Sequence, residues 1–117
     1  MEVTIERLTD RLPDVLAALV AESEQAGWRF VRRLADDWTA GTNRFDQPGE
    51  ALFAAWSAGR PVGVCGLNVD PYILDRGVGR VRRLYVLTEY RRRGVGQRLV
   101  RAVIAAAVRP SARQFAG

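Results

Sequence analysis

The sequence contains no lysine and no histidine, so all 18 of its basic residues are arginine. Without lysine there is no Schiff-base nucleophile and no Walker-type phosphate contact, and without histidine there is no Ser-His-Asp or Cys-His pair. A zinc site of the usual Cys/His kind is excluded too, because Cys65 is the single cysteine. Any catalysis must therefore use carboxylates, tyrosine, arginine or backbone amides, and we predict no metal site.

A single cysteine also allows no disulfide within the chain. The N-terminus lacks the basic and then apolar pattern of a signal peptide, and no apolar run approaches the roughly 20 residues that span a bilayer. These features predict a cytoplasmic protein without a membrane partner. Cys65 lies in the middle of an apolar segment, which favours a small core residue over a nucleophile.

With 117 residues we expect a single domain, 1–117, built on one core.

Acidic and basic residues are distributed unevenly along the chain. Residues 1–75 hold 7 arginines and 12 acidic residues, a net charge of −5, whereas residues 76–117 hold 11 arginines and one acid, a net charge of +10. A basic half of this kind indicates an anionic partner, either nucleic acid or a phosphate-bearing small molecule.

The periodicity of apolar residues predicts both strands and helices. Residues 57–60 contain glycine and join two apolar alternating segments, which is typical of a hairpin. The predicted elements are a strand at 2–7, helices at 12–27 and 28–38, strands at 51–56, 61–69 and 80–87, and a helix from Gly94 that Pro110 ends.

The stretch from Leu84 to Leu99 places an arginine-rich turn and two glycines between a strand and the first turn of a helix. A helix N-terminus presents unpaired N–H groups and the positive end of the helix dipole, and it therefore binds anions. Gly94 and Gly96 lack Cβ atoms and let a phosphate approach the backbone, while Arg91–Arg93 add positive charge. The expected ligand is a pyrophosphate or a similar anion.

The spacing Arg91-x-x-Gly94-x-Gly96 lacks the third spaced glycine of the Rossmann motif and the lysine of the Walker motif. It resembles the Arg/Gln-x-x-Gly-x-Gly/Ala motif of the GNAT family of N-acetyltransferases. The Leu-Tyr-Val-x-x-x-Tyr of residues 84–90, the apolar helix after the motif and the hairpin containing residues 63–67 also lie where that family has its corresponding elements. The resemblance covers residues 3–108 and implies an α/β (α+β) fold with a mixed, mostly antiparallel sheet flanked by helices.

The resemblance implies a site for acetyl-CoA, as co-substrate, in two parts. The backbone of the strand end would pair with the pantetheine arm as a neighbouring strand does and would offer an amide to the thioester oxygen. The turn and the helix start would bind the pyrophosphate, and an amine of a small molecule or a peptide would attack the thioester directly. The predicted cofactor-binding residues are Leu84, Tyr85, Val86, Arg91, Arg92, Arg93, Gly94, Val95, Gly96 and Gln97.

The sequence departs from the family's pattern after Val108, where the family has a fifth strand, a fourth helix with a proton-donating tyrosine, and two more strands. The tail at 109–117 shows no alternation and predicts no strand. We therefore expect an incomplete domain, from a truncated chain, a shifted reading frame or a diverged gene. The strand at 84–87 would then have an open edge that invites pairing with a second copy, and turnover would be weak or absent.

Two other interpretations remain open. One is a non-enzymatic module that binds nucleic acid or another polyanion through the basic half; it lacks interleaved aromatic residues and any nucleic-acid motif, so nucleic acid is the less favoured partner. The other is a CoA-binding remnant without activity.

No residue is assigned a catalytic role from the sequence. We expect Tyr85 to pack in the sheet rather than to catalyse, and Glu89 to be a turn residue rather than a general base. The aromatic residues of the second helix are predicted to be core, with the lining of an acceptor pocket as the alternative: Trp28, Phe30 and Trp38. The polar residues of the loop before the last strand are expected to be solvated, with orientation of an amine as the alternative: Asp70, Tyr72 and Asp75.

Overall fold

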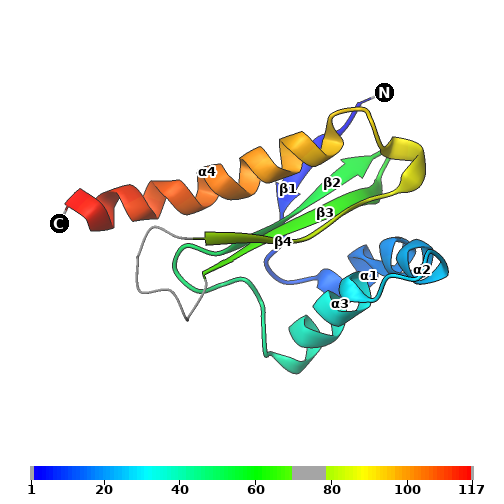
Figure 1. Cartoon of the computed structure of the whole chain (residues 1–117), viewed down its shortest axis with the longest axis horizontal. Helices are drawn as coiled ribbons and strands as arrows, with labels where there is room; N and C mark the ends of the chain where they lie inside the picture. Colours follow the sequence, from blue (N-terminus) through cyan, green and yellow to red (C-terminus); the bar gives the residue numbers. More distant parts are fainter. Residues whose placement is uncertain (1, 70–78, 117) are drawn as a thin grey trace.

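Residues 2–69 and 79–116, which this computed structural model describes, form one sheet with helices on both of its faces (Figure 1). The elements in chain order are β1 (Thr4–Arg7), α1 (Leu12–Val15), α2 (Ala17–Gln25), α3 (Phe30–Ala40), β2 (Ala51–Ser57), β3 (Arg60–Val69), β4 (Gly79–Val86), the 3-10 helix η1 (Thr88–Tyr90) and α4 (Val95–Ala116). This order agrees with the one predicted from the sequence, except that α1 and α2 replace the first predicted helix and η1 precedes the last helix.

The four strands lie in the order β1-β2-β3-β4, so β1 and β4 are the edges of the sheet in the described part of the chain. Every pairing there is antiparallel, which fits the predicted mostly antiparallel sheet. The predicted hairpin joins β2 to β3 through Ala58 and Gly59, whose φ angles are 53° and 79°. Two consecutive positive φ angles are what a tight hairpin turn with the twist of its strands requires.

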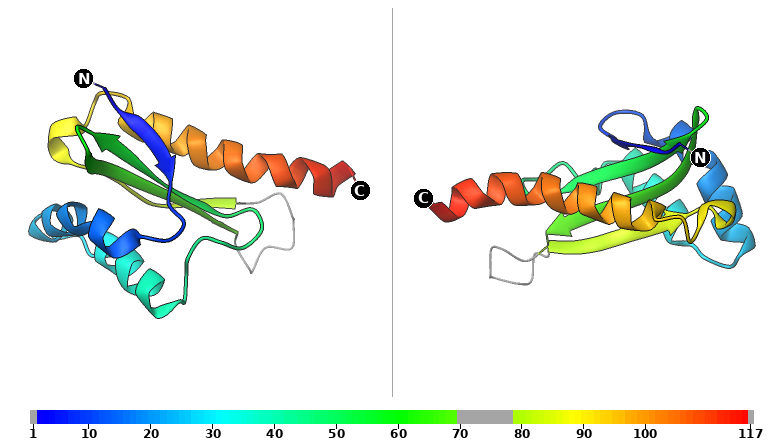
Figure 2. Two further views of the ribbon diagram at one scale, coloured as in Figure 1. Left: turned by 180° about the vertical axis from the view of Figure 1, so that it is seen from behind. Right: turned by 90° about the horizontal axis from the view of Figure 1, so that it is seen from above.

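The two faces of the sheet are covered by different helices. Helix α4 lies along one face, and α1, α2 and α3 cover the other, as the views in Figure 2 show. Leu99 and Val103 of α4 are fully buried, and so are Leu16, Leu19 and Val31 of the other layer. The apolar periodicity of each helix therefore marks the side that packs against the sheet.

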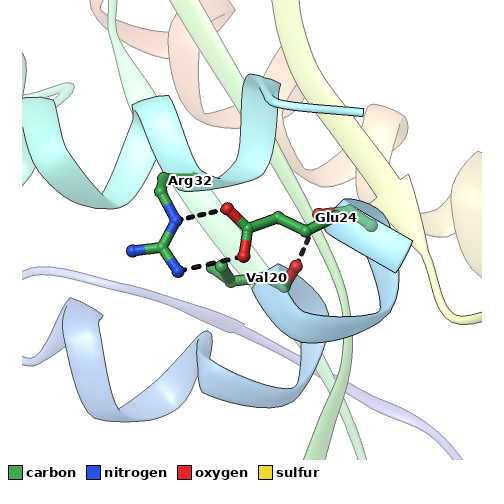
Figure 3. A network of polar contacts seen from close by, with 4 residues as sticks. Val20, Glu24 and Arg32 are labelled. Atoms are coloured by element: carbon green, nitrogen blue, oxygen red, sulfur yellow. Dashed lines mark hydrogen bonds and ion pairs between the residues drawn. The ribbon is translucent and has the colours of Figure 1, made fainter. Parts of the chain in front are cut away.

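An ion pair joins α2 to α3 at the surface of the helical layer (Figure 3). The Arg32 guanidinium donates two hydrogen bonds to the Glu24 carboxylate, one of them from Nη2 to Oε1 at 3.0 Å. Both side chains are exposed, so the pair contributes little to stability. Nearby, the buried Ser23 hydroxyl donates to the Val20 carbonyl at 2.9 Å and so has a partner within its own helix.

The single helix predicted from Leu12 to Gly27 is wrong, because the structure divides it at Leu16. Leu16 has φ −97° and ψ 2°, outside the regular helical values, and it separates α1 from α2. Leu12, Leu16 and Leu19 are all fully buried. The bend at Leu16 turns the apolar residues of both short helices toward the same core.

The predicted core position of Trp28 is also wrong. Gly27 ends the preceding helix with φ 90°, so Trp28 lies in the link before α3 and its side chain is 56% exposed. The buried stripe of α3 begins at Val31 and continues through Leu34 and Trp38. The sequence pattern placed the helix start two residues too early, which put an exposed tryptophan on the buried face.

Pro110 does not end the last helix as predicted, since α4 continues to Ala116. A proline inside a helix removes one backbone hydrogen bond and usually kinks or ends it, at a cost of about 3 kcal/mol. The residues after it include good helix formers, alanine, arginine and glutamine, which favour continuation of the helix.

The predictions for Asp70, Tyr72 and Asp75 fall outside the described residues.

Replacing Gly66 with alanine is expected to destabilise the protein by about 1–3 kcal/mol, the usual cost of overpacking a core. A Cβ atom on Gly66 would lie 2.4 Å from Cε1 of the buried Phe45 ring, which would have to move. The free energy of unfolding in urea measures the loss. In a Phe45→Leu background, Gly66→Ala should cost less, because the smaller side chain gives way; equal costs in both backgrounds contradict this explanation.

Candidate functional site

The chain leaves the sheet at the end of β4 through a tight turn. Leu87 donates its N–H to the Val62 carbonyl of β3 at 2.9 Å, which is the last backbone bond of the sheet on this side. The 3-10 helix η1 follows, and Arg92 and Gly94 then have φ angles of 64° and 79° before α4 begins. The Gly94 carbonyl accepts the N–H of Arg98 at 3.1 Å, so Gly94 is the residue that starts the helix.

A cavity of about 570 Å³ lies between this turn, the end of β4 and the first turn of α4. It brings together all of the predicted cofactor residues except Arg93. Tyr90, which the sequence analysis did not select, is the additional lining residue. The lining consists of Leu84, Tyr85, Val86, Tyr90, Arg91, Arg92, Gly94, Val95, Gly96 and Gln97.

The two positions of the motif hold glycine for different structural reasons. Gly94 has a positive φ, a conformation that glycine adopts without strain, so the turn itself favours glycine there. Gly96 has no such requirement, and a Cβ atom on it would meet only the Val86 side chain, at an ordinary distance of 3.9 Å. Protein packing therefore does not explain Gly96, whereas an anion that approaches the helix N-terminus would need the space.

The three arginines of the turn have different positions. Arg91 donates from Nε to the Val86 carbonyl at 2.8 Å, and its guanidinium lies 5.1 Å from the centre of the Tyr85 ring. Arg92 lines the cavity, while Arg93 lies outside the lining with its guanidinium 6.0 Å from the Tyr90 ring centre. Arg91 and Arg92 are therefore the cations at the mouth of the cavity, with Arg91 held by the strand end.

The backbone of β4 presents alternate residues to its open edge. Leu87 donates toward β3, and in an antiparallel pair the backbone groups of successive residues point to opposite sides. Val86 therefore directs its N–H and C=O groups away from β3, and Tyr85 directs its own toward β3. The pairing shifts register between Tyr85 and Arg82, so this alternation is not extended to Leu84. The Arg91 contact with the Val86 carbonyl agrees with this assignment.

Tyr90 and Glu89 form a second polar group at the turn. Arg60 of β3 donates to the Glu89 carboxylate at 2.6 Å, which confirms Glu89 as a turn residue held by an ion pair. The Arg60 guanidinium also lies 5.8 Å from the Tyr90 ring centre. Hydrogen bonding to Ser57 and Arg60 lowers the pKa of Tyr90. Tyr90 directly precedes Arg91 in the turn. This position in the sequence could have identified it as a residue that lines the cavity.

Glu22 of α2 is the contact that sequence reasoning missed completely. Its Oε1 atom accepts a hydrogen bond from the Tyr85 hydroxyl at 2.6 Å and two from Thr88, from the backbone N–H at 3.0 Å and from the hydroxyl at 3.1 Å. Burial raises the pKa of Tyr85 to about 12, with the hydrogen bond to Glu22 adding to the effect. Sixty-three positions separate Glu22 from Tyr85, and no local pattern connects them.

Cys65 is free and buried in β3, and burial raises the pKa of its thiol to about 12. A thiol in this state is a poor nucleophile, which agrees with the predicted core role. Among residues 2–69 and 79–116 there is no group of three or more side chains suited to holding a metal ion. No helix in that part of the chain has the length and apolar character to cross a membrane.

Solved structures with this arrangement belong to acetyltransferases. A protein of Exiguobacterium sp. 255-15 assigned to the acetyltransferases shares 31% identity and has a TM-score of 0.82, covering 94% of this chain and 72% of its own. A GNAT-family acetyltransferase from Staphylococcus aureus MU50 shares 18% identity with a TM-score of 0.69, and the match covers 92% of this chain and 68% of that one.

A protein of Klebsiella pneumoniae assigned to the acyl-CoA N-acyltransferases shares 21% identity with a TM-score of 0.58; the match covers 92% of this chain and 64% of that protein. A comparison with curated protein sequences finds no match. The sequence model of the acetyltransferase (GNAT) family matches residues 15–116. With most of its length matched, the chain belongs to the GNAT family of acetyltransferases.

Proposed function

We propose that the protein binds acetyl-CoA in the cavity at the start of α4 and transfers the acetyl group to an amine. The observation that carries the proposal is Gly96, which borders the cavity without any packing requirement for glycine. The space that a side chain would fill lies beside the unpaired N–H groups of the first helical turn. A diphosphate fits this position in both size and charge.

The charges around the cavity support the same ligand. Arg91 and Arg92 line it, and arginine presents a planar fork of donors that matches phosphate oxygens. Glu89, the acid nearest in sequence, is paired with Arg60, and the Glu22 carboxylate is directed to Tyr85 and Thr88. The charge left facing a ligand is therefore positive.

The open edge of β4 supports a position for the pantetheine arm. Amide groups of that arm can pair with the outward backbone groups of the strand end at Val86 as a neighbouring strand would. With the thioester along the strand, an acceptor amine attacks its carbonyl carbon, the C–S bond breaks, the thiolate of CoA leaves and the proton lost by the amine passes to water. We expect the acceptor to be a small-molecule or peptide amine, and the buried free Cys65 fits a reaction in the reducing cytoplasm.

We also propose that a second copy pairs with the β4 edge. Leu84 and Ile104 are 41% and 44% exposed, and a shallow groove between β4 and α4 is lined by Leu84, Gly96, Gln97, Val100 and Arg101. Ile104 lies one helical turn beyond Val100, so it extends this apolar surface along α4. An unpaired strand beside exposed apolar side chains is the kind of edge on which strands from another copy add.

Binding of CoA and acetyl-CoA should be saturable with one site in calorimetry. Gly96→Glu should weaken it at least tenfold, because the new side chain occupies the cavity and its carboxylate repels the diphosphate. Ala105→Glu is the matched control: it adds the same side chain on an exposed position of the same helix, about 14 Å further along the axis. Equal weakening by both variants, or none by Gly96→Glu, contradicts the proposed site.

A short DNA duplex titrated at two salt concentrations tests the polyanion interpretation. The cavity predicts that CoA is bound at both concentrations and in preference to the duplex. A general polyanion surface instead predicts duplex binding that falls steeply with salt and no preference for CoA. Tight duplex binding together with no detectable CoA binding would replace the proposal with the non-enzymatic module.

Light scattering after size-exclusion chromatography should show a dimer at micromolar concentration. Since a second copy and the pantetheine arm would use the same backbone groups of β4, excess CoA should shift the dimer toward monomer. A clean monomer without CoA contradicts pairing through this edge, and a dimer that CoA leaves unchanged places the interface elsewhere.

A further inference from the structure

The Glu22 carboxylate connects the helical layer to the turn that borders the cavity. One oxygen, Oε1, accepts all three of its hydrogen bonds, from the Tyr85 hydroxyl and from the N–H and hydroxyl of Thr88. Tyr85 is on β4, and Thr88 is the first residue of η1. A single side chain of α2 therefore contacts both the strand and the turn that border the cavity.

The turn between β4 and α4 has few bonds of its own. Within it, the Tyr90 N–H donates to the Leu87 carbonyl at 2.9 Å and the Arg91 N–H to the Thr88 carbonyl at 3.2 Å. Three-residue 3-10 helices have poor internal hydrogen-bond geometry and depend on contacts with the rest of the protein. By accepting the Thr88 N–H, Glu22 satisfies the first free donor of η1, as an N-terminal cap does.

The groups that face Glu22 stabilise its ionised form. Burial alone raises the pKa of Glu22, but the hydrogen bonds from Tyr85 and Thr88 and the positive charge of Arg91 outweigh burial and lower it. From α3, the uncharged ring of Phe30 packs edge to face on Tyr85, the residue that donates to Glu22, with ring centres 5.9 Å apart. Glu22 is therefore a carboxylate at neutral pH.

Arg91 completes the connection to the cavity. Its Nε atom holds the Val86 carbonyl, and its guanidinium lies over the ring of Tyr85, whose hydroxyl is bound to Glu22. The position of Tyr85 thus determines where Arg91 is held, and the position of Thr88 determines where the turn enters α4. Tyr85 and Thr88 both donate hydrogen bonds to the same oxygen of Glu22, Oε1.

We propose that Glu22 is a positioning residue for the phosphate-binding turn: through Tyr85 and Thr88 it holds Arg91 and the start of α4 where they bind the diphosphate of CoA. The inference rests on the proposed function. The direction of the change in CoA affinity distinguishes positioning from simple electrostatics. A carboxylate near the cavity repels an anion, so electrostatics alone predicts that removing Glu22 tightens CoA binding. If Glu22 acts by positioning, its removal weakens binding.

The test compares Glu22→Ala, which removes the accepting oxygen, with Glu24→Ala, which removes the same side chain two residues away on the same helix. Glu24 accepts its side-chain hydrogen bonds from Arg32 of α3, as Figure 3 shows, and not from the turn. NMR titrations at fixed ionic strength give dissociation constants for CoA and for pantetheine, which lacks the diphosphate. We expect Glu22→Ala to raise the constant for CoA about tenfold and leave that for pantetheine unchanged, and Glu24→Ala to change neither.

The remaining outcomes separate the inference from the function it rests on. If wild-type protein binds CoA and Glu22→Ala binds it equally or more tightly, positioning by Glu22 is wrong and the proposed function stands. Parallel weakening toward CoA and pantetheine means a role in overall stability only, which also overturns the inference. If wild-type protein does not bind CoA, the proposed function fails and the inference fails with it.

A second variant keeps the test valid if Glu22→Ala folds poorly. Thr88→Val removes only the hydroxyl donor and leaves the backbone bond to Glu22, so the fold should tolerate it. We expect a two- to threefold weaker affinity for CoA and an unchanged affinity for pantetheine. An unchanged affinity for both ligands contradicts the contribution of Thr88 to the turn.

Discussion

The hydrogen bond from the Leu87 N–H to the Val62 carbonyl determines where the sheet ends and the turn begins. It extends the pairing of Gly63 with Val86 and of Val64 with Tyr85, and so assigns each residue of the strand end a direction. The backbone groups of Val86 then face the open edge, and the Tyr85 side chain faces the layer that contains α2. A slip of one residue in this register would exchange those directions and separate Tyr85 from Glu22.

The same register sets how closely α4 approaches the sheet. Gly63 of β3 lies under α4, where a Cβ atom would be 3.1 Å from the Leu99 side chain and 3.4 Å from that of Val86. The absence of a side chain at Gly63 lets Leu99 bury completely against the sheet. Since Gly96 lies one helical turn before Leu99, this close packing also fixes how far the first turn of α4 stands from the end of β4, and with it the width of the cavity.

Local sequence patterns predicted the features that depend on neighbouring residues. The alternation around Leu84, Tyr85 and Val86 and the spacing of Arg91, Gly94 and Gly96 placed nearly the whole cavity lining, because the strand, turn and helix that build it are consecutive in the chain. The bend at Leu16 and the exposure of Trp28 could not be predicted in this way, since both follow from how α1, α2 and α3 fit one core.

Contacts between segments far apart in the sequence could not be predicted from local patterns either, because they also depend on how the elements pack. Glu22 has the sequence context of any surface carboxylate on an amphipathic helix, and only the packing of α2 against β4 brings it to Tyr85 and Thr88. Arg93 differs from Arg91 and Arg92 only by its place in the turn, where the positive φ of Arg92 changes the direction of the chain. The spacing of residues in a sequence motif does not predict such a change in the direction of the backbone.

Tyr85 and Glu22 are suited to binding rather than to proton transfer. Burial and the bond to Glu22 raise the pKa of Tyr85 to about 12, which makes it a weak proton donor near neutral pH. The hydrogen bonds that lower the pKa of Glu22 make it a weak base, and arginine does not titrate. With no lysine or histidine in the chain, we infer that these groups contribute orientation and charge to the proposed transfer, and holding an amine at the right distance from a thioester supplies a large share of such a rate.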